Sequence, residues 1–167
     1  MLSFLFRGLT ADPNRGAALF DALTAVARQP SWYLEGGVPD TLDGRFAVLA
    51  TSCALALIRF EREDERGNAA SVALTERFIA VMESEHRELG LGDPALGKTV
   101  RKLVGMLARR TELWRGANGQ WIEATRESLY KGKIADAPLN HSAAALRDFA
   151  QRLDATPLAQ LEEGRIA

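Results

Sequence analysis

The sequence predicts an all-α protein, a single compact bundle of about five to seven helices. Three observations support this prediction. Apolar residues recur at the spacing of a helix along most of the chain, no segment shows the alternation typical of a strand, and breaks containing glycine or proline separate the periodic segments. The chain has no internal repeat and no long proline-rich linker, so we expect residues 1–167 to form one domain.

The composition is typical of a globular protein with a packed core, with 47% hydrophobic and 26% charged residues. The formal net charge of −1 gives no overall attraction to DNA or anionic lipid. The only cysteine, Cys53, can close no intramolecular disulfide, and the apolar start Met1 to Leu9 is too short for a signal peptide. We therefore expect a cytoplasmic location, with peripheral association at the inner face of the cytoplasmic membrane left open.

The first helix is predicted by an apolar stripe that ends before residue 29. The next segment, 29–43, contains two prolines and two glycines and is predicted to be a loop. Its two large aromatic residues, Trp32 and Tyr33, are expected to pack on the core. Polar residues at its end can cap a second helix that begins near Leu42. The stripe of the first helix consists of Leu19, Phe20, Leu23, Val26 and Ala27.

The helix that begins near Leu42 is the most apolar one and is expected to be central. Its uncharged run, 46–58, is shorter than the roughly 20 residues that a membrane-spanning helix needs. We predict that this helix runs to the charged stretch 61–66 and stops at Gly67. A third helix is predicted over about 70–89, ending at a glycine that permits left-handed backbone.

Three further helices are expected. The first has the clearest helical period, from Val100 to Trp114. The second covers about 121–130, and the third contains residues 139–153 after a loop at 132–138. Pro157 is predicted to begin a short, frayed tail.

Enzyme chemistry finds little support in the sequence. Glu83 and His86 have the spacing of one half of a di-iron carboxylate site, but no second such pair surrounds His141, so we interpret them as part of a polar helix face. Cys53 lies among apolar neighbours and is expected to be buried and inert. We predict a protein that is not an enzyme and needs no cofactor and no metal.

One face of the helix around Val100 is basic, because Glu112 alone opposes six cations there. This face can bind RNA, acidic lipid or an acidic protein surface, or it can pair with the acidic segments of the two preceding helices. The sequence leaves both interpretations open. The cations are Lys98, Arg101, Lys102, Arg109, Arg110 and Arg115.

Three separated blocks of the sequence are distinctive: 36–46 (GGVPDTLDGRF), 62–65 (REDE) and 90–93 (GLGD), the last followed by Gly97 and Lys98. In this order they resemble the ubiquinol-cytochrome c chaperone family, most strongly over 32–130. The resemblance implies a non-catalytic assembly chaperone for the respiratory bc1 complex (complex III). Such a chaperone binds cytochrome b or another bc1 subunit, or a second assembly factor, close to the ribosome and the membrane.

The chain also departs from the family's pattern. Glu127 and Ser128 stand where the family has an arginine and an asparagine. The chain shows no transit sequence or membrane segment of the mitochondrial kind. It therefore resembles a bacterial-type member.

The distinctive blocks supply the candidate partner-binding residues. Asp40 and Asp43 can cap a helix, but capping does not explain why they occur with Arg45 and with the acidic residues of the other blocks. We expect the bundle to bring these side chains to one surface, the charged rim of a groove between helices. The full candidate set is Asp40, Asp43, Arg45, Glu63, Asp64, Asp93, Lys98, Arg101 and Lys102.

Two other functions stay open at this point. One is a helical module that binds a small molecule or a lipid, which requires a dry apolar cavity. The other is a protein that binds RNA or the ribosome surface through the basic face described above, with an affinity that falls steeply as salt rises.

Overall fold

The structure, a computed structural model, describes residues 14–167, and its regular secondary structure in this range consists of helices, with no strand. The prediction of an all-α bundle is confirmed. The expectations for Met1 to Leu9 lie outside the described residues. Six of the helices in this range have nine or more residues, and two are short, with four and five. The helices are α2 (Ala17–Ala27), α3 (Ser31–Leu34), α4 (Leu42–Phe60), α5 (Glu65–Glu88), α6 (Asp93–Arg115), α7 (Trp121–Leu129), α8 (Asp136–Ala155) and α9 (Leu158–Glu162).

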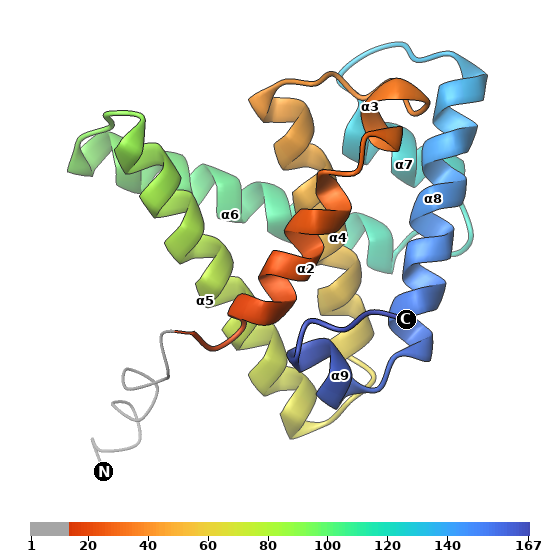
Figure 1. The fold of residues 1–167 in the computed structure, drawn as a ribbon. Helices are drawn as coiled ribbons and strands as arrows, with labels where there is room; N and C mark the ends of the chain where they lie inside the picture. The colour runs from red at the N-terminus through yellow and green to blue at the C-terminus, as the bar shows by residue number, and fades with distance from the viewer. Residues whose placement is uncertain (1–13) are drawn as a thin grey trace.

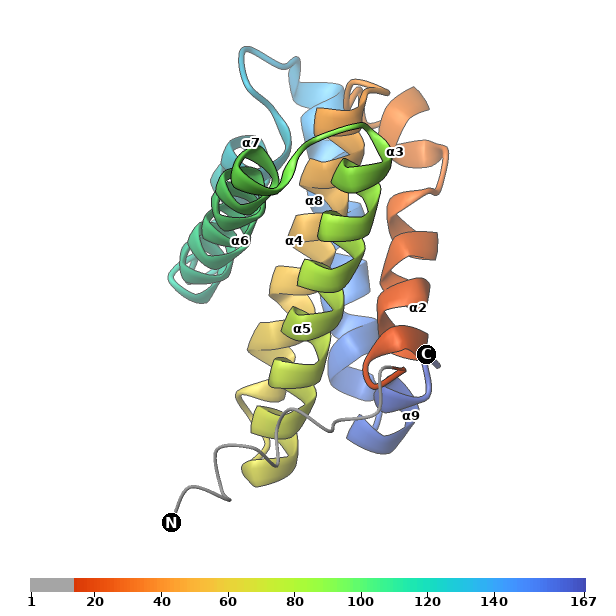
Figure 2. The same ribbon diagram turned by 90° about the vertical axis from the view of Figure 1, so that its left-hand side faces the viewer.

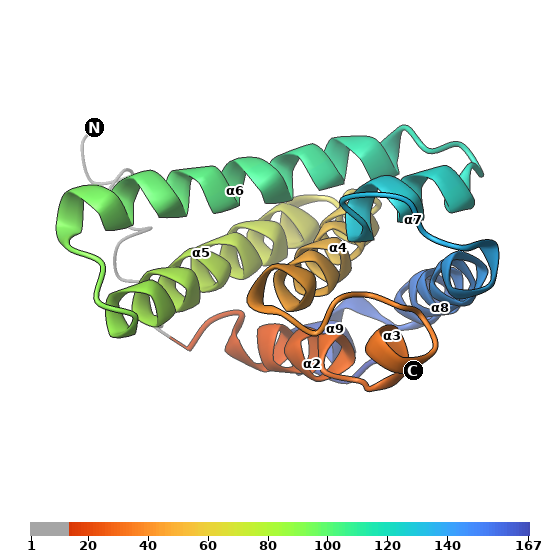
Figure 3. The ribbon, with the colours of Figure 1, turned by 90° about the horizontal axis from the view of Figure 1, so that it is seen from above.

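α4 is the central helix, as predicted, and contacts α2, α5, α6, α7 and α8. Seen from above, α6 and α2 lie on opposite sides of α4, and α5 and α8 lie on the other two (Figure 3). Between residues 47 and 56 every residue except Leu49 is buried. The hydroxyls of Thr51 and Ser52 donate to the carbonyl oxygens of Ala47 and Val48, at 2.7 and 3.0 Å, so their burial leaves no donor unsatisfied.

α5 and α6 form a long hairpin whose turn lies away from the other helices in Figure 1 and faces the viewer in Figure 2. The hairpin turn contains Gly90 in a left-handed conformation, with φ 88°, which confirms the predicted end of the helix before it. Within residues 14–167, none of these helices is both long and apolar enough to cross a membrane.

The predicted boundary at Gly67 is wrong. α4 ends at Phe60 and α5 begins at Glu65, so Gly67 lies inside a helix. It is buried, and a Cβ atom at this position would overlap the carbonyl oxygen of Phe60 and meet the Cβ of Glu63 at 2.7 Å. The close approach of the α4–α5 turn therefore requires glycine here, and the residue does not act as a helix stop.

Two predicted irregular segments contain helices. The loop predicted over 29–43 includes α3, in which Trp32 is 2% exposed and donates from Nε1 to the carbonyl oxygen of Val26 at 2.8 Å. The predicted packing of both aromatic residues of this segment is confirmed, since the hydroxyl of Tyr33 donates to the carbonyl oxygen of Ala27 at 2.6 Å.

The tail after Pro157 is not frayed, because it forms α9 and buries two leucines in the core. Similarly, α8 begins at Asp136, inside the loop predicted at 132–138.

We predict that alanine has opposite effects on the free energy of unfolding at two glycines that lie inside helices. Gly67→Ala should lower the free energy of unfolding by roughly 1–3 kcal/mol, because the backbone of the turn must move. Gly105→Ala should raise it by about 0.5–1 kcal/mol, because nothing lies within 4 Å of a Cβ there and alanine favours a helix. Denaturant titrations of the two variants check this; equal effects would contradict the packing at the α4–α5 turn.

We also predict that the thiol of Cys53 is inert in the folded protein. The side chain is fully buried on α4, and burial raises its pKa to about 12, so the reactive thiolate is scarce at neutral pH. A thiol reagent should label the native protein only at the rate of its unfolding and label the denatured protein at once. Rapid labelling without unfolding would disprove the burial.

Candidate functional site at the amino end of α4

The amino end of α4 is capped by Thr41, whose Oγ1 accepts the backbone N–H of Gly44 at 3.1 Å. Neither Asp40 nor Asp43 makes this cap. Gly44 is buried, and a Cβ atom there would overlap the carbonyl oxygen of Pro39, so the chain folds back closely on the first turn of the helix. The two aspartates are therefore left to make contacts outside the helix.

Both aspartates form ion pairs at the surface. The Nε of Arg45 donates to Asp40 at 2.7 Å, and the hydrogen bond from this guanidinium lowers the pKa of the Asp40 carboxyl. Lys131, in the turn between α7 and α8, donates to Asp43 and lowers the pKa of that carboxyl in the same way. Lys102 of α6 lowers the pKa of Asp43 further through its charge, so this lysine lies within electrostatic range of the carboxyl.

Tyr130 fixes the segment that leads into α4. Its hydroxyl donates to the carbonyl oxygen of Gly36 at 2.6 Å and lies 2.8 Å from Oγ of Ser142 on α8. These bonds join the loop before α4 to α7 and α8. The charged residues at the end of α4 therefore stand on a firmly held backbone.

A large apolar side chain lies among these charges. Leu42, the first residue of α4, is 75% exposed, although leucine is usually buried in proteins of this kind. We define the α4-end surface as the set of side chains that includes this leucine and its charged neighbours: Asp40, Leu42, Asp43, Arg45, Lys102 and Lys131.

The structure does not bring the acidic candidates together on one surface, contrary to the expectation from the sequence. Glu63 and Asp64 follow the carboxyl end of α4, and this helix of 19 residues is about 28 Å long. Asp93 begins α6 at the far turn of the α5–α6 hairpin, with Lys98 and Arg101 one and two turns beyond it (Figure 3).

The charged residues near the carboxyl end of α4 make contacts with other helices. Arg59, which is 8% exposed, donates to the carbonyl oxygens of Leu153 and Thr156 at 3.2 and 3.3 Å and pairs with Glu63 at 2.9 Å. Glu61 pairs with Arg115 of α6. Two further ion pairs, Arg62 with Asp154 and Arg66 with Glu162, join this turn to α8 and α9. Three residues of the stretch 61–66 thus pair with other helices, although every residue of the stretch except Glu63 is exposed.

The six cations of the basic face of α6 differ in whether they contact other parts of the bundle. Arg110 is half-buried; it donates to the carbonyl oxygen of Ser128 at 2.9 Å and lies over the ring of Phe46. Arg115 pairs with Glu61 and Glu112. The other four cations are exposed and have no ion-pair partner within residues 14–167; they are Lys98, Arg101, Lys102 and Arg109.

The polar face of α5 contains Glu83 and His86, as the sequence suggested. The Nδ1 of His86 lies 2.8 Å from the carbonyl oxygen of Met82. In the part of the chain that the structure describes, no three His, Cys, Asp or Glu side chains gather where they could hold a metal ion.

Three features of the site were not predicted from the sequence. The exposure of Leu42, the bonds made by Tyr130 and the pairing of Asp43 with Lys131 all depend on segments that meet only in the folded chain. The residue types carried no signal for these contacts, because a leucine after a helix cap usually packs inward and a lysine in a turn usually faces solvent.

We predict that both aspartates of the α4-end surface titrate below the ordinary carboxyl range. Lys131→Ala should return the Asp43 pKa toward about 3.9, and Arg45→Ala should do so for Asp40. Each aspartate has a lower pKa in the folded state than in the unfolded state. Each ion pair therefore stabilises the fold fully at a pH above the unfolded-state pKa, and this stabilisation is lost as the pH falls through the folded-state pKa. NMR titrations of the carboxyl groups test this. An Asp43 pKa that stays unchanged in Lys131→Ala would show that the two side chains do not form an ion pair.

Comparisons with known proteins agree with this fold. The crystal structure of the Cbp3 homolog from Brucella abortus matches with a TM-score of 0.76 and 26% sequence identity, over 100% of this chain and 96% of that one. No curated protein sequence matches the chain significantly. Residues 34–167, which include every candidate residue, match the family described as ubiquinol-cytochrome C chaperone. The chain therefore belongs to the ubiquinol-cytochrome c chaperone family.

Proposed function

We propose that the protein is a non-catalytic assembly factor for the bc1 complex (complex III). The observation that carries this proposal is the family match over residues 34–167, which extends from the end of α3 to the end of the chain. The similarity to the Cbp3 homolog from Brucella abortus over all of this chain supports it. The protein binds its client directly, and the client is cytochrome b or another bc1 subunit, or a second assembly factor.

We place the binding contact at the α4-end surface. An exposed apolar side chain within a polar rim is the usual composition of a protein interface, and Leu42 has such a rim in Asp40, Asp43 and Arg45. The charged residues of the rim form exposed ion pairs. Charged side chains of a partner can replace these ion pairs with little loss of folding stability. The backbone beneath is held by Tyr130, which reduces the ordering required on binding.

Deleting the gene in the native host tests the proposed function. The amount of assembled bc1 complex should fall severalfold, while other respiratory complexes stay near their usual level. Blue native gels and difference spectra of b-type cytochromes measure this. An unchanged amount of bc1 complex in the deletion strain would refute the role in assembly.

Charge reversal at the two ends of α4 tests the location. Asp43→Lys combined with Arg45→Glu should abolish co-purification of bc1 subunits and change the Tm by less than about 5 °C, because only exposed pairs are lost. The matched control at the other end is Asp64→Lys combined with Arg66→Glu, which also leaves the net charge unchanged and also breaks an exposed ion pair, that of Arg66 with Glu162. If the control fails to co-purify bc1 subunits and the first variant still does so, the binding site lies at the carboxyl end of α4 and our placement is wrong.

A second candidate function uses the four exposed cations of α6, which lack ion-pair partners in the described residues. They span about 16 Å of helix and would contact the phosphates of RNA, including that of the ribosome. A fourfold charge removal, with Lys98, Arg101, Lys102 and Arg109 changed to alanine, would then abolish salt-dependent binding to purified ribosomes. Ribosome binding that the variant keeps would exclude this function for the α6 face.

A further inference from the structure

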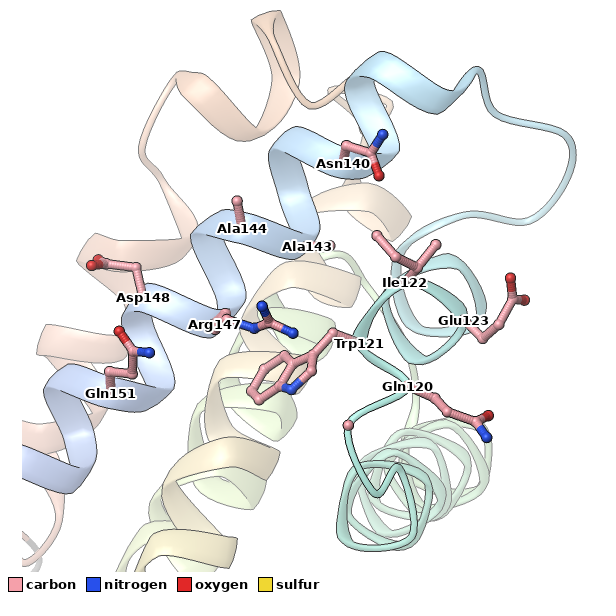
Figure 4. A pocket seen from close by; sticks show the side chains of 11 residues that line it. Gln120, Trp121, Ile122, Glu123, Asn140, Ala143, Ala144, Arg147, Asp148 and Gln151 are labelled. Carbon is pink, nitrogen blue, oxygen red and sulfur yellow. The ribbon is translucent and has the colours of Figure 1, made fainter.

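A groove lies between α7 and α8, on residues that the α4-end surface does not include (Figure 4). Its volume is about 570 Å³. Trp121 and Ile122 contribute one side of it, and the small side chains of Ala143 and Ala144 line the other. Ile122 is 38% exposed, which is unusual for a large aliphatic side chain. The groove therefore presents apolar surface to its surroundings.

The aromatic part of the groove is held rigidly from below. Trp121 lies against Trp114 of α6, with ring centroids 5.2 Å apart. Trp114 is 6% exposed and donates from Nε1 to Oγ of Ser128 at 2.8 Å. A buried, hydrogen-bonded neighbour fixes the position of the Trp121 ring. The groove is thus formed before any partner arrives, which lowers the entropy lost on binding.

Arg147 gives the groove its charge. Its guanidinium lies over the Trp121 ring, 5.5 Å from the centroid, and it has no ion-pair partner within residues 14–167. The two acidic residues nearby are already paired, Asp148 with Arg152 at 3.1 Å and Glu123 with Arg126 at 3.5 Å. Both acidic residues line the groove, and the arginines that neutralise them lie outside its lining. The charge left unneutralised beside the apolar surface is therefore positive.

The arrangement of the lining residues indicates the shape of the occupant. Asn140, Ala144, Arg147 and Gln151 follow one another on a single face of α8, so this wall is about 16 Å long, the length of three helical turns. Tryptophan and arginine are the residue types most often found at the energetic centre of protein interfaces. A guanidinium stacked on a ring keeps its N–H edges free for a carboxylate.

We propose that the α7–α8 groove binds an amphipathic helical segment of a protein partner, about three turns long. A large apolar side chain of this segment fills the space between Ile122 and Ala144, and an aspartate or glutamate one turn away pairs with Arg147. The inference stands on the groove alone and does not depend on the proposed role in bc1 assembly.

The test is selection from a phage-displayed library of random 16-residue peptides on the full-length protein. Selected sequences should carry a large apolar residue three or four positions from Asp or Glu, and the synthetic peptides should shift the amide NMR signals of residues 121–122 and 143–147. Affinity should fall at least about tenfold in Arg147→Glu and in Ala144→Trp, which fills the groove.

The control is Arg109→Glu, the same change at an arginine of α6. Arg109 is exposed, has no ion-pair partner in the described residues and does not line the groove. This variant should keep the affinity within about twofold. The proposal is overturned if no peptide is enriched, if the enriched peptides are basic, or if they bind Arg147→Glu as tightly as the unaltered protein.

Discussion

The burial of α4 on all sides is the constraint on which the remaining structure depends. The helices α2, α5, α6, α7 and α8 all pack against it, and they can approach closely because residues 47–56 include four alanines, a serine, a threonine and a cysteine. Their hydroxyls bond back to the helix itself, so the helix carries no unsatisfied polar side chain into the core. Glycine extends the same close approach to both ends, at Gly44 and at Gly67.

The two ends of α4 use their charges differently. At the carboxyl end, Arg59 satisfies carbonyl oxygens at the end of α8, and the neighbouring acidic and basic residues pair with α6, α8 and α9. These charges join helices that are distant in sequence. At the amino end the pairs of Asp40 and Asp43 lie on the surface, beside an exposed leucine. Surface pairs contribute little to folding, which leaves this end available for a partner.

The α4-end surface and the α7–α8 groove share their supporting residues. Tyr130 at the end of α7 bonds to the loop before α4 and lies beside Ser142 of α8, while Ser128 of the same helix receives the hydrogen bond of Trp114 beneath the groove. The short helix α7 therefore positions both surfaces. Binding at either of the two proposed surfaces would require little rearrangement of the backbone.

The sequence by itself determined the helical class, the central place of α4 and the burial of Cys53 and Trp32, because apolar spacing and side-chain size act locally along a helix. The tertiary structure determined the role of Gly67 and the partners of the charged residues. Gly67 looks like a helix stop in the sequence, and only the approach of Phe60 shows why glycine stands inside α5. Likewise Glu63 and Asp43 look like members of one acidic cluster. They lie at opposite ends of α4. The packing of the folded chain determines their ion-pair partners, which are Arg59 for Glu63 and Lys131 for Asp43.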